Sequence, residues 1–319
     1  MKTDPSAEKE WLRKMNKTVP TKAAVNADSV KTESKKKLGF SALAGMDELK
    51  QLVTEGFINV LNNPECAKAY GIKPPSMLLY GPAGCGKTFF AECMAAEMDG
   101  VEFMKIEPDD LASTLIHGTQ EKIGQLFDMA IHRSPTLLFF DEFDAFVPKR
   151  NNDENNYQNN EVNEFLCMLN NASDKGVYVV AATNHPERID RAVLRTGRID
   201  ELIYVGMPDI KARESLFRIE LSKLPMADDI DYANLARMTE GYNCSDISYI
   251  VKYASRKMFN ESIKCKDAPY CLITEKLLEE SIAHKSPSVS SRDLKEFERL
   301  RMEFSPRDTD CVRTTVGFV

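Results

Sequence analysis

Short runs of apolar residues, each bounded by turn residues, alternate with helical patterns from Met77 to Val205. In one intervening segment, Ile123 to Ile131, apolar side chains recur at the spacing of an amphipathic helix. The apolar runs are strand candidates at Met77–Tyr80, Val101–Ile106, Thr136–Phe140, Val177–Ala182 and Leu202–Val205. This alternation predicts an α/β fold, in which a parallel sheet carries helices on both faces.

After Pro208-Asp209 the strand patterns stop, and only helical patterns follow. They cover Arg213–Leu221, Tyr232–Thr239, Ser245–Phe259, Thr274–Ala283 and Ser291–Met302. We therefore expect a large α/β domain over residues 38–208 and a small all-helical domain over residues 209–305, closed by the last of these helices.

Three segments are too polar to bury a core of their own. Residues 1–37 carry a single tryptophan, Trp11, and are predicted to be a disordered or partner-docking arm. Residues 306–319 are predicted to be a flexible tail. Asn151 to Asn160 reads NNDENNYQNN and is predicted to be a mobile loop.

The chain has 319 residues and a net charge of −7, which disfavours a mainly electrostatic hold on nucleic acid or on an anionic membrane. No stretch reaches the ~18 apolar residues of a membrane helix, and the first residues have no signal-peptide core, so a cytoplasmic location is expected. The eight cysteines are scattered without a C-x-x-C pair and are expected to be free thiols. Cys265, Cys271 and His284 form a loosely spaced zinc alternative.

A glycine-rich segment with a lysine joins the first strand candidate to a helical pattern. It reads Gly81-Pro82-Ala83-Gly84-Cys85-Gly86-Lys87-Thr88 and is followed by Phe89. Glycines allow backbone N–H groups to surround phosphate oxygens, and the helix N-terminus adds positive potential. Lys87 would reach the terminal phosphates and the Thr88 hydroxyl would ligate Mg²⁺. The segment predicts a nucleotide phosphate site.

Polar residues follow two other strand candidates. Asp141 and Glu142 come directly after Thr136–Phe140, at the strand end where parallel sheets bind ligands. Asp141 suits Mg²⁺ binding, and Glu142 suits activation of the water that attacks the γ-phosphate. Asn184 follows Val177–Ala182 and could orient that water, although a plain turn is the alternative.

Further along the chain, Arg195 and Arg198 lie beside Gly197 and suit a polyanion. Together these motifs resemble the AAA family of ATPases, in the branch that contains valosin-containing protein, katanin and spastin. The resemblance extends from about Phe40 to Phe304. It includes the segments Phe40–Gly45, Gly71–Pro75, Gly81–Thr88, Thr136–Glu142, Ala181–Asn184 and Leu194–Asp200.

The resemblance implies a P-loop NTPase sheet followed by a helical AAA lid. It also implies a ring, usually of six subunits, in which Arg195 and Arg198 act as arginine fingers on the neighbouring subunit and Asn184 is a sensor. The adenine and ribose contacts that it implies are Leu43, Ala44, Gly45, Leu216, Glu220, Cys244 and Ser245. The expected cofactors are ATP and Mg²⁺.

The chain departs from the pattern of these relatives at several positions. Cys244 replaces a glycine, and Glu220 replaces a histidine or asparagine, which alters adenine and ribose contacts. Leu115 and Ile116 lie where the first pore loop of relatives carries an aromatic residue, and they are the expected substrate contacts. Asn159 and Asn160 replace a pair of arginines used between subunits.

The resulting hypothesis is an Mg²⁺-dependent ATPase that forms a homo-oligomeric ring and remodels, disassembles or unfolds a protein partner. The alternative is a nucleotide-gated regulatory module that signals by ring formation without threading substrate. A motor that acts on nucleic acid is disfavoured, because the chain is acidic and has no DNA-reading segment.

Overall fold

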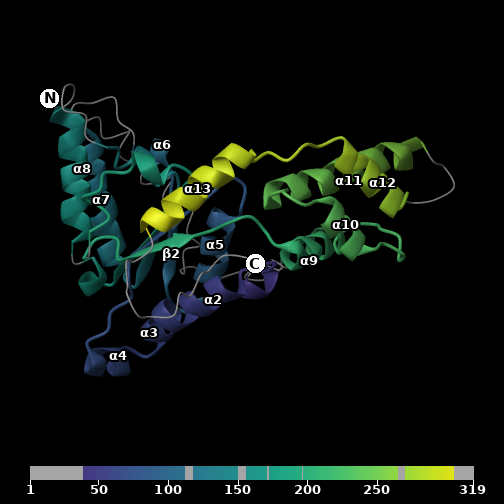
Figure 1. The fold of residues 1–319 in the computed structure, drawn as a ribbon. Coiled ribbons are helices and arrows are strands. Elements are labelled where there is room, and N and C mark those ends of the chain that lie inside the picture. The colour runs from purple at the N-terminus through teal and green to yellow at the C-terminus, as the bar shows by residue number, and fades with distance from the viewer. Residues whose placement is uncertain are drawn as a thin grey trace. The chain divides into compact units, whose positions relative to one another are not determined.

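The computed structural model describes residues 39–111, 118–149, 156–170, 172–195, 197–264 and 270–304. Its contacts divide the chain into two compact units (Figure 1). We call the first the sheet unit; it comprises Met1–Gly39, Glu55–Leu79 and Ala91–Leu202. We call the second the helical unit; it comprises Phe40–Thr54, Tyr80–Phe90 and Ile203–Val319. The predicted boundary near residue 208 stays a prediction, because the division by contacts does not follow the order of the chain.

A five-stranded sheet has the strand order β2-β3-β4-β1-β5. Its strands are β1 (Met77–Tyr80), β2 (Glu102–Ile106), β3 (Thr136–Phe140), β4 (Val177–Thr183) and β5 (Glu201–Tyr204). In the parallel register, Thr136 of β3 lies between Glu102 of β2 and Val177 of β4. Every residue of β3 is buried, as expected for a central strand covered on both faces. The predicted α/β class is confirmed.

Helices α7 (Gly118–His132) and α8 (Asn156–Leu169) pack against each other beside the sheet (Figure 1). Phe127 of α7 and Phe165 of α8 meet Phe140 of β3, with ring centroids 6.5 and 5.0 Å away from that of Phe140. Aromatic pairs at this separation stabilise a core beyond their buried area. The shorter helices of the sheet unit are α3 (Asn59–Asn62), α4 (Pro64–Tyr70) and α6 (Pro108–Leu111).

The predicted loop over Asn151–Asn160 is wrong in its second half, because α8 begins at Asn156. Its polar composition argues against burial, but it does not prevent a helix from extending beyond its buried residues. Val162, Phe165 and Leu169 are buried on one face of α8, and the helix begins six residues before the first of them, at Asn156.

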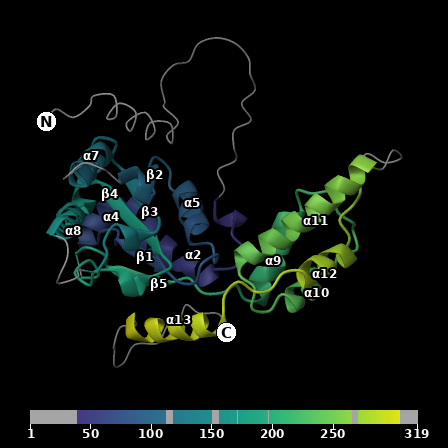
Figure 2. The ribbon, with the colours of Figure 1, turned by 90° about the horizontal axis from the view of Figure 1, so that it is seen from above.

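The helical unit contains the helices that the sequence predicted after Pro208. They are α9 (Ile210–Leu221), α10 (Tyr232–Met238), α11 (Cys244–Lys264), α12 (Glu275–Ala283) and α13 (Ser291–Phe304). Helices α9 to α12 lie together in Figure 2 around a buried core that includes Phe217, Ile250 and Leu278. The unit also contains α2 (Asp47–Val53), and α5 (Lys87–Glu97) begins in it.

Helix α13 lies against the ends of β1 and β5. Tyr80 contacts Tyr204 and Phe304, with ring centroids 5.6 and 5.5 Å apart. Arg301 lies over the Tyr204 ring, 5.6 Å from its centroid. This contact of a guanidinium with an aromatic face adds an electrostatic attraction to the apolar packing. Helix α13 therefore packs against Tyr80, the residue that directly precedes the glycine-rich loop.

Replacement of Gly81 by alanine is expected to destabilise the protein by about 3 kcal/mol or more. Gly81 has φ +152°, and a Cβ there would lie 2.1 Å from the Val205 carbonyl oxygen. The backbone cannot move aside easily, since the Val205 N–H donates to the Tyr80 carbonyl at 2.8 Å. Denaturant unfolding measures the loss.

Gly71→Ala is the matched control for this substitution. Gly71 also has a positive φ, +65°, but nothing lies within 4 Å of a Cβ at that position. The control should cost only about 1–2 kcal/mol, from backbone strain alone. Equal losses in the two variants would show that the contact with Val205 contributes nothing.

Candidate nucleotide-binding site

The glycine-rich loop and the first turn of α5 place Lys87 at the centre of the candidate site. Lys87 is buried, with 7% of its surface exposed. Its Nζ donates to the carbonyl oxygens of Gly81 and Pro82, each at 2.8 Å. Helix α5 begins at Lys87, so its first N–H groups lie beside the same loop. Backbone donors, a helix N-terminus and a buried ammonium group together favour a bound polyphosphate.

The start of α11 holds the outer side of the loop. Asn243 Nδ2 donates to the Ala83 carbonyl at 3.0 Å, and the Ser245 N–H donates to the Gly84 carbonyl at 3.1 Å. The predicted contacts Gly84 and Ser245 are thus brought together. The family resemblance implied that the turn Gly241–Asp246 closes the nucleotide pocket, but it assigned no separate role to Asn243. Its available signal was an amide side chain immediately before a helix start, where such residues often bind backbone groups.

Two cysteines of the candidate site are neutral packing groups. Cys85 is fully buried, and its Sγ lies 3.7 Å from Sδ of Met207. Burial, with a smaller contribution from neighbouring Cys244, raises the pKa of the Cys85 thiol to about 12. Burial raises the pKa of Cys244 to about 11. Cys244 therefore presents an uncharged thiol at a predicted nucleotide contact.

The predicted adenine contacts come from two segments of the helical unit. Leu43 is buried, and a Cβ on Gly45 would lie 2.6 Å from Cβ of Ala212 in α9. Leu216, one turn further along α9, packs against the core of the unit. Glu220 follows on the same helix, and its carboxylate accepts from Ser248 Oγ at 2.7 Å. The structure thus brings the segment around Gly45 to the helix that carries Leu216 and Glu220.

In the sheet unit, Asp141 and Glu142 follow β3 as predicted. The Glu142 N–H donates to Asp141 Oδ1 at 3.1 Å, and Lys105 Nζ lies 3.6 Å from Asp141 Oδ2. Burial lowers the pKa of Lys105, but a hydrogen bond to Glu107 and the charge of Asp141 outweigh it, so the pKa is raised. The acidic strand end therefore faces a charged ammonium group.

The backbone of Glu142 is left-handed, with φ 51° and ψ 48°, and its side chain is exposed. A non-glycine residue in this conformation is locally strained, and such residues cluster at functional sites. The turn aims the Glu142 side chain differently from that of a residue continuing the strand. This conformation could not be predicted from the sequence.

Asn184 follows β4 beside a fixed hydroxyl. Thr183 Oγ1 donates to Asp144 Oδ1 at 2.6 Å and accepts from the His185 N–H at 2.9 Å. Both backbone neighbours of Asn184 are therefore held. Thr183 and Asp144 are site-supporting residues that the sequence analysis missed, because 39 residues separate them along the chain.

Arg198 is held within its own unit in this structure. Its Nη1 donates to the Ala192 carbonyl at 2.6 Å, and its Nε donates to Asn170 Oδ1 at 3.3 Å. Arg195, three residues earlier, is exposed. The Gly197 N–H donates to Asp200 Oδ1 at 2.8 Å, and this bond fixes the turn from Gly197 to Asp200 that contains Arg198.

Several predicted features lie outside the described residues. These are the arm over residues 1–37, the tail over residues 306–319, the pore-loop residues Leu115 and Ile116, and Cys265 of the zinc alternative. Within the described residues, no three His, Cys, Asp or Glu side chains are grouped to hold a metal ion. None of the described helices combines the length and apolar character needed to span a membrane.

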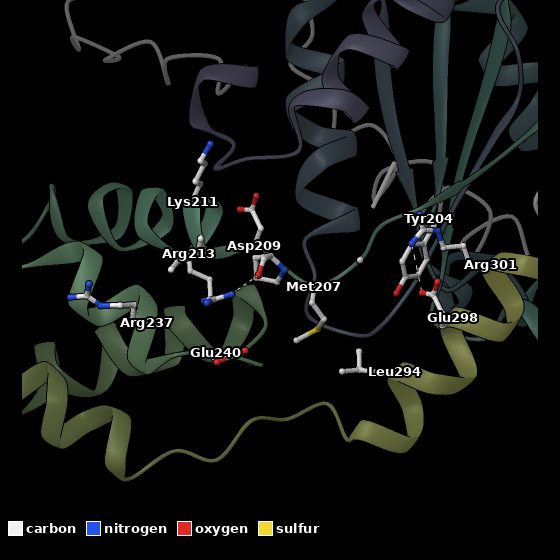
Figure 3. A pocket seen from close by; sticks show the side chains of 13 residues that line it. Tyr204, Met207, Asp209, Lys211, Arg213, Arg237, Glu240, Leu294, Glu298 and Arg301 are labelled. Atoms are coloured by element: carbon white, nitrogen blue, oxygen red, sulfur yellow. Dashed lines mark hydrogen bonds and ion pairs between the residues drawn. The ribbon is translucent and has the colours of Figure 1, made fainter. Parts of the chain in front are cut away.

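The helical unit also contains a cavity of about 860 Å³ (Figure 3). Figure 3 shows Tyr204, Glu298 and Arg301 close together at one end, while Met207 and Leu294 give it an apolar surface. None of the predicted nucleotide contacts lines it. Its lining is connected to the glycine-rich loop through the Met207–Cys85 contact.

Comparisons with known proteins agree with this arrangement. Residues 77–207 match the model of the "ATPase family associated with various cellular activities (AAA)", and residues 229–269 match that of the "AAA+ lid domain". A cell division cycle protein 48 homolog of Archaeoglobus fulgidus is 33% identical over 306 residues, which are 92% of this chain and 40% of the relative. The ATPase family gene 2 protein of Schizosaccharomyces pombe is 32% identical over 234 residues, 72% of this chain and 28% of the relative.

The chain thus spans less than half the length of these two curated relatives. The glycine-rich loop, the acidic end of β3 and the arginine segment fall within the first matched region, and the start of α11 falls within the second. The chain belongs to the AAA family of ATPases, with an AAA ATPase domain followed by an AAA lid domain.

Proposed function

We propose that this chain hydrolyses ATP with Mg²⁺ as a subunit of a homo-oligomeric ring, and that the ring remodels a protein partner. The observation that carries the proposal is the buried Lys87 at the start of α5, whose ammonium group donates to the Gly81 and Pro82 carbonyls of the preceding glycine-rich loop. A buried ammonium group beside the N–H groups of a helix N-terminus provides the positive potential that a polyphosphate requires.

The proposed reacting residues follow strands that are consecutive in the sheet order. The strand order places β1 between β4 and β5, with β3 beyond β4, so the segments after β1, β3 and β4 belong to adjacent strands. We assign Lys87 to the β- and γ-phosphates, Glu142 to the attacking water, and Asn184 to the orientation of that water. The left-handed backbone at Glu142 supports its role, because non-glycine residues in this conformation cluster at functional sites.

Thr88 and Asp141 are the residues that would hold Mg²⁺. A hydroxyl and a carboxylate are hard oxygen donors of the kind that Mg²⁺ prefers, and Asp141 already faces a cation, the Lys105 ammonium group. When bound, the ion would neutralise charge that develops on the phosphate oxygens. Lys105 would then compete with it for the Asp141 carboxylate.

Arg195 and Arg198 are proposed to complete the site of a neighbouring subunit in a ring of six. Arg195 is exposed, and Arg198 is bound by an uncharged carbonyl and an uncharged amide. A phosphate is a stronger partner for a guanidinium than either neutral group. Arg198 can therefore exchange its present partners for a γ-phosphate.

The protein partner is proposed from the family and the names of the relatives, which refer to the cell division cycle and to an ATPase family. Polypeptide threading would involve Leu115 and Ile116. We also propose that the ring acts in the cytoplasm. A purely regulatory ring differs in one measurable property, because no partner protein would be altered by its ATP hydrolysis.

Lys87→Ala is expected to weaken MgATP binding by about 100-fold or more, since it removes a buried charge from the phosphate site. Isothermal titration calorimetry measures the affinity. The matched control is Lys73→Ala, which removes an exposed ammonium group paired with Asp174 and should leave the affinity unchanged. Equal affinities of wild type and Lys87→Ala would contradict the proposed phosphate site.

A further inference from the structure

Two hydrogen bonds join the start of α11, in the AAA lid domain, to carbonyl groups of the glycine-rich loop. We call this loop, Gly81–Thr88, the phosphate loop below. Asn243 donates to the Ala83 carbonyl, and the Ser245 N–H donates to the Gly84 carbonyl. Both acceptors belong to peptide units whose N–H groups are those of Gly84 and Cys85. All of these groups belong to the helical unit.

A trans peptide unit is planar, and its carbonyl and N–H groups point in opposite directions. A donor that fixes the Ala83 carbonyl therefore also fixes the direction of the Gly84 N–H, which points away from Asn243. In the same way, the Ser245 N–H holds the Gly84 carbonyl and thereby fixes the direction of the Cys85 N–H. These amides are the kind of donor that a phosphate loop presents to its ligand.

Glycine at position 84 makes the arrangement specific. Gly84 has φ +76°, and a Cβ there would lie 2.6 Å from Asn243 Nδ2. The glycine therefore provides both the left-handed backbone and the space for the asparagine amide. A side chain at position 84 would therefore displace the Asn243 amide from the loop.

Asn243 is itself locked in place by Asp246, which is 2% exposed. Asn243 Oδ1 accepts from the Asp246 N–H at 2.7 Å, and an Asp246 carboxylate oxygen accepts from the Asn243 N–H at 3.3 Å. The first bond also assigns the orientation of the Asn243 amide, because it leaves Nδ2 to face Ala83.

The segment between α12 and α13 supports this carboxylate. Lys285 Nζ lies 2.7 Å from Asp246 Oδ1, and the Ser288 N–H donates to Asp246 Oδ2 at 3.0 Å. Burial raises the pKa of Asp246, but hydrogen bonds from Lys285, Ser288 and Asn243 outweigh it and lower the pKa overall. The carboxylate is therefore charged, and the asparagine cannot easily rotate away.

We propose that Asn243 is a positioning residue for the phosphates, which presets the N–H donors of the phosphate loop by holding the Ala83 carbonyl from the lid. The inference rests on the proposed nucleotide site and deepens it. It assigns to this residue an effect on the polyphosphate rather than on the adenine or ribose. The consequence is that a lid residue influences the affinity for the polyphosphate without contacting it.

The test measures the binding of two ligands, MgATP and magnesium tripolyphosphate, by calorimetry. Tripolyphosphate has no base or sugar, so it isolates the phosphate loop. Asn243→Ala should weaken both ligands by the same factor, about 3- to 10-fold, as expected for the loss of one aligned hydrogen bond. The thermal midpoint of the unliganded variant shows whether it is folded.

Two further variants complete the design. Asn234→Ala is the matched control, since its amide donates to Glu275 and Glu279 at 3.0 and 3.3 Å and joins α10 to α12 away from the loop. Its affinities for both ligands should equal those of the wild type. Asn243→Ser adds no charge, and its hydroxyl can still accept from the Asp246 N–H as a helix cap, but it is too short to donate to the Ala83 carbonyl. It should therefore also weaken both ligands, even if the alanine variant does not fold.

Unchanged tripolyphosphate binding in both Asn243 variants would overturn the inference, as would an equal loss in Asn234→Ala. Loss of MgATP binding alone would assign Asn243 to the base or the sugar, which also overturns it. Failure of wild-type protein to bind either ligand would instead contradict the proposed nucleotide site. The two failures are therefore distinguishable.

Discussion

Arg198→Ala is expected to lower the kcat for ATP hydrolysis of the assembled protein by about 10³- to 10⁵-fold, the range that arginine fingers contribute. The physical reason is that a guanidinium placed on the γ-phosphate compensates the charge of the transition state. Nucleotide affinity should change little, since in the proposed site the subunit's own glycine-rich loop and Lys87 bind the phosphates. Steady-state hydrolysis across a dilution series measures the effect, and wild-type activity per subunit should fall as the ring dissociates.

The control for this prediction is Arg188→Ala, which removes an exposed guanidinium near the end of β4 whose Nε lies 3.8 Å from Glu187. Its turnover should match that of the wild type. Mixing Arg198→Ala subunits with Glu142→Gln subunits should restore some turnover at interfaces that pair an intact arginine with an intact glutamate. Wild-type activity that is independent of concentration, with no recovery on mixing, would contradict an arginine that acts on the neighbouring subunit.

Glu142→Gln is expected to lower kcat by about 10²- to 10⁴-fold while leaving MgATP affinity within a few-fold of the wild type. The substitution keeps the size of the side chain and removes the charge that polarises the attacking water. The Glu142 N–H still donates to Asp141, so the local turn should persist. Single-turnover hydrolysis and calorimetric titration measure the two quantities separately.

Glu121→Gln provides the comparison, because Glu121 is exposed on α7 and contributes to no part of the candidate site. It should hydrolyse ATP at the wild-type rate. If Glu142→Gln retained full turnover, the attacking water would need another base, and the assignment of Glu142 would be withdrawn. A loss of binding together with turnover would place Glu142 in nucleotide binding instead.

The strands could be predicted from the sequence because each is an apolar run of nearly the length of the element. Met77–Tyr80 and Thr136–Phe140 match β1 and β3 in full. The phosphate loop was equally visible, since its chemistry lies within eight consecutive residues. A strand or a binding loop can be predicted from the sequence when all the residues that define it lie in one short segment.

Contacts between distant segments could not be predicted in this way. Asn243 and Ala83 are 160 residues apart; the family resemblance placed their two segments at one nucleotide, but no local pattern indicated the hydrogen bond between them. The Thr183–Asp144 bond is hidden for the same reason. The start of α8 at Asn156 was missed because polarity reports burial, whereas helix formation can extend beyond the buried turns. The partners of Arg198 depend on the fold of the loop around Ala192.

The burial of Cys85 protects its thiol from electrophiles. Burial raises the pKa of the Cys85 thiol to about 12, so the thiol is protonated at pH 7, and the thiolate is the form that alkylating agents and oxidants attack. Cys66 and Cys167 are exposed instead. Oxidative stress or a covalent probe would therefore modify the surface of this chain and leave its phosphate loop intact, although a cysteine lies within the loop itself.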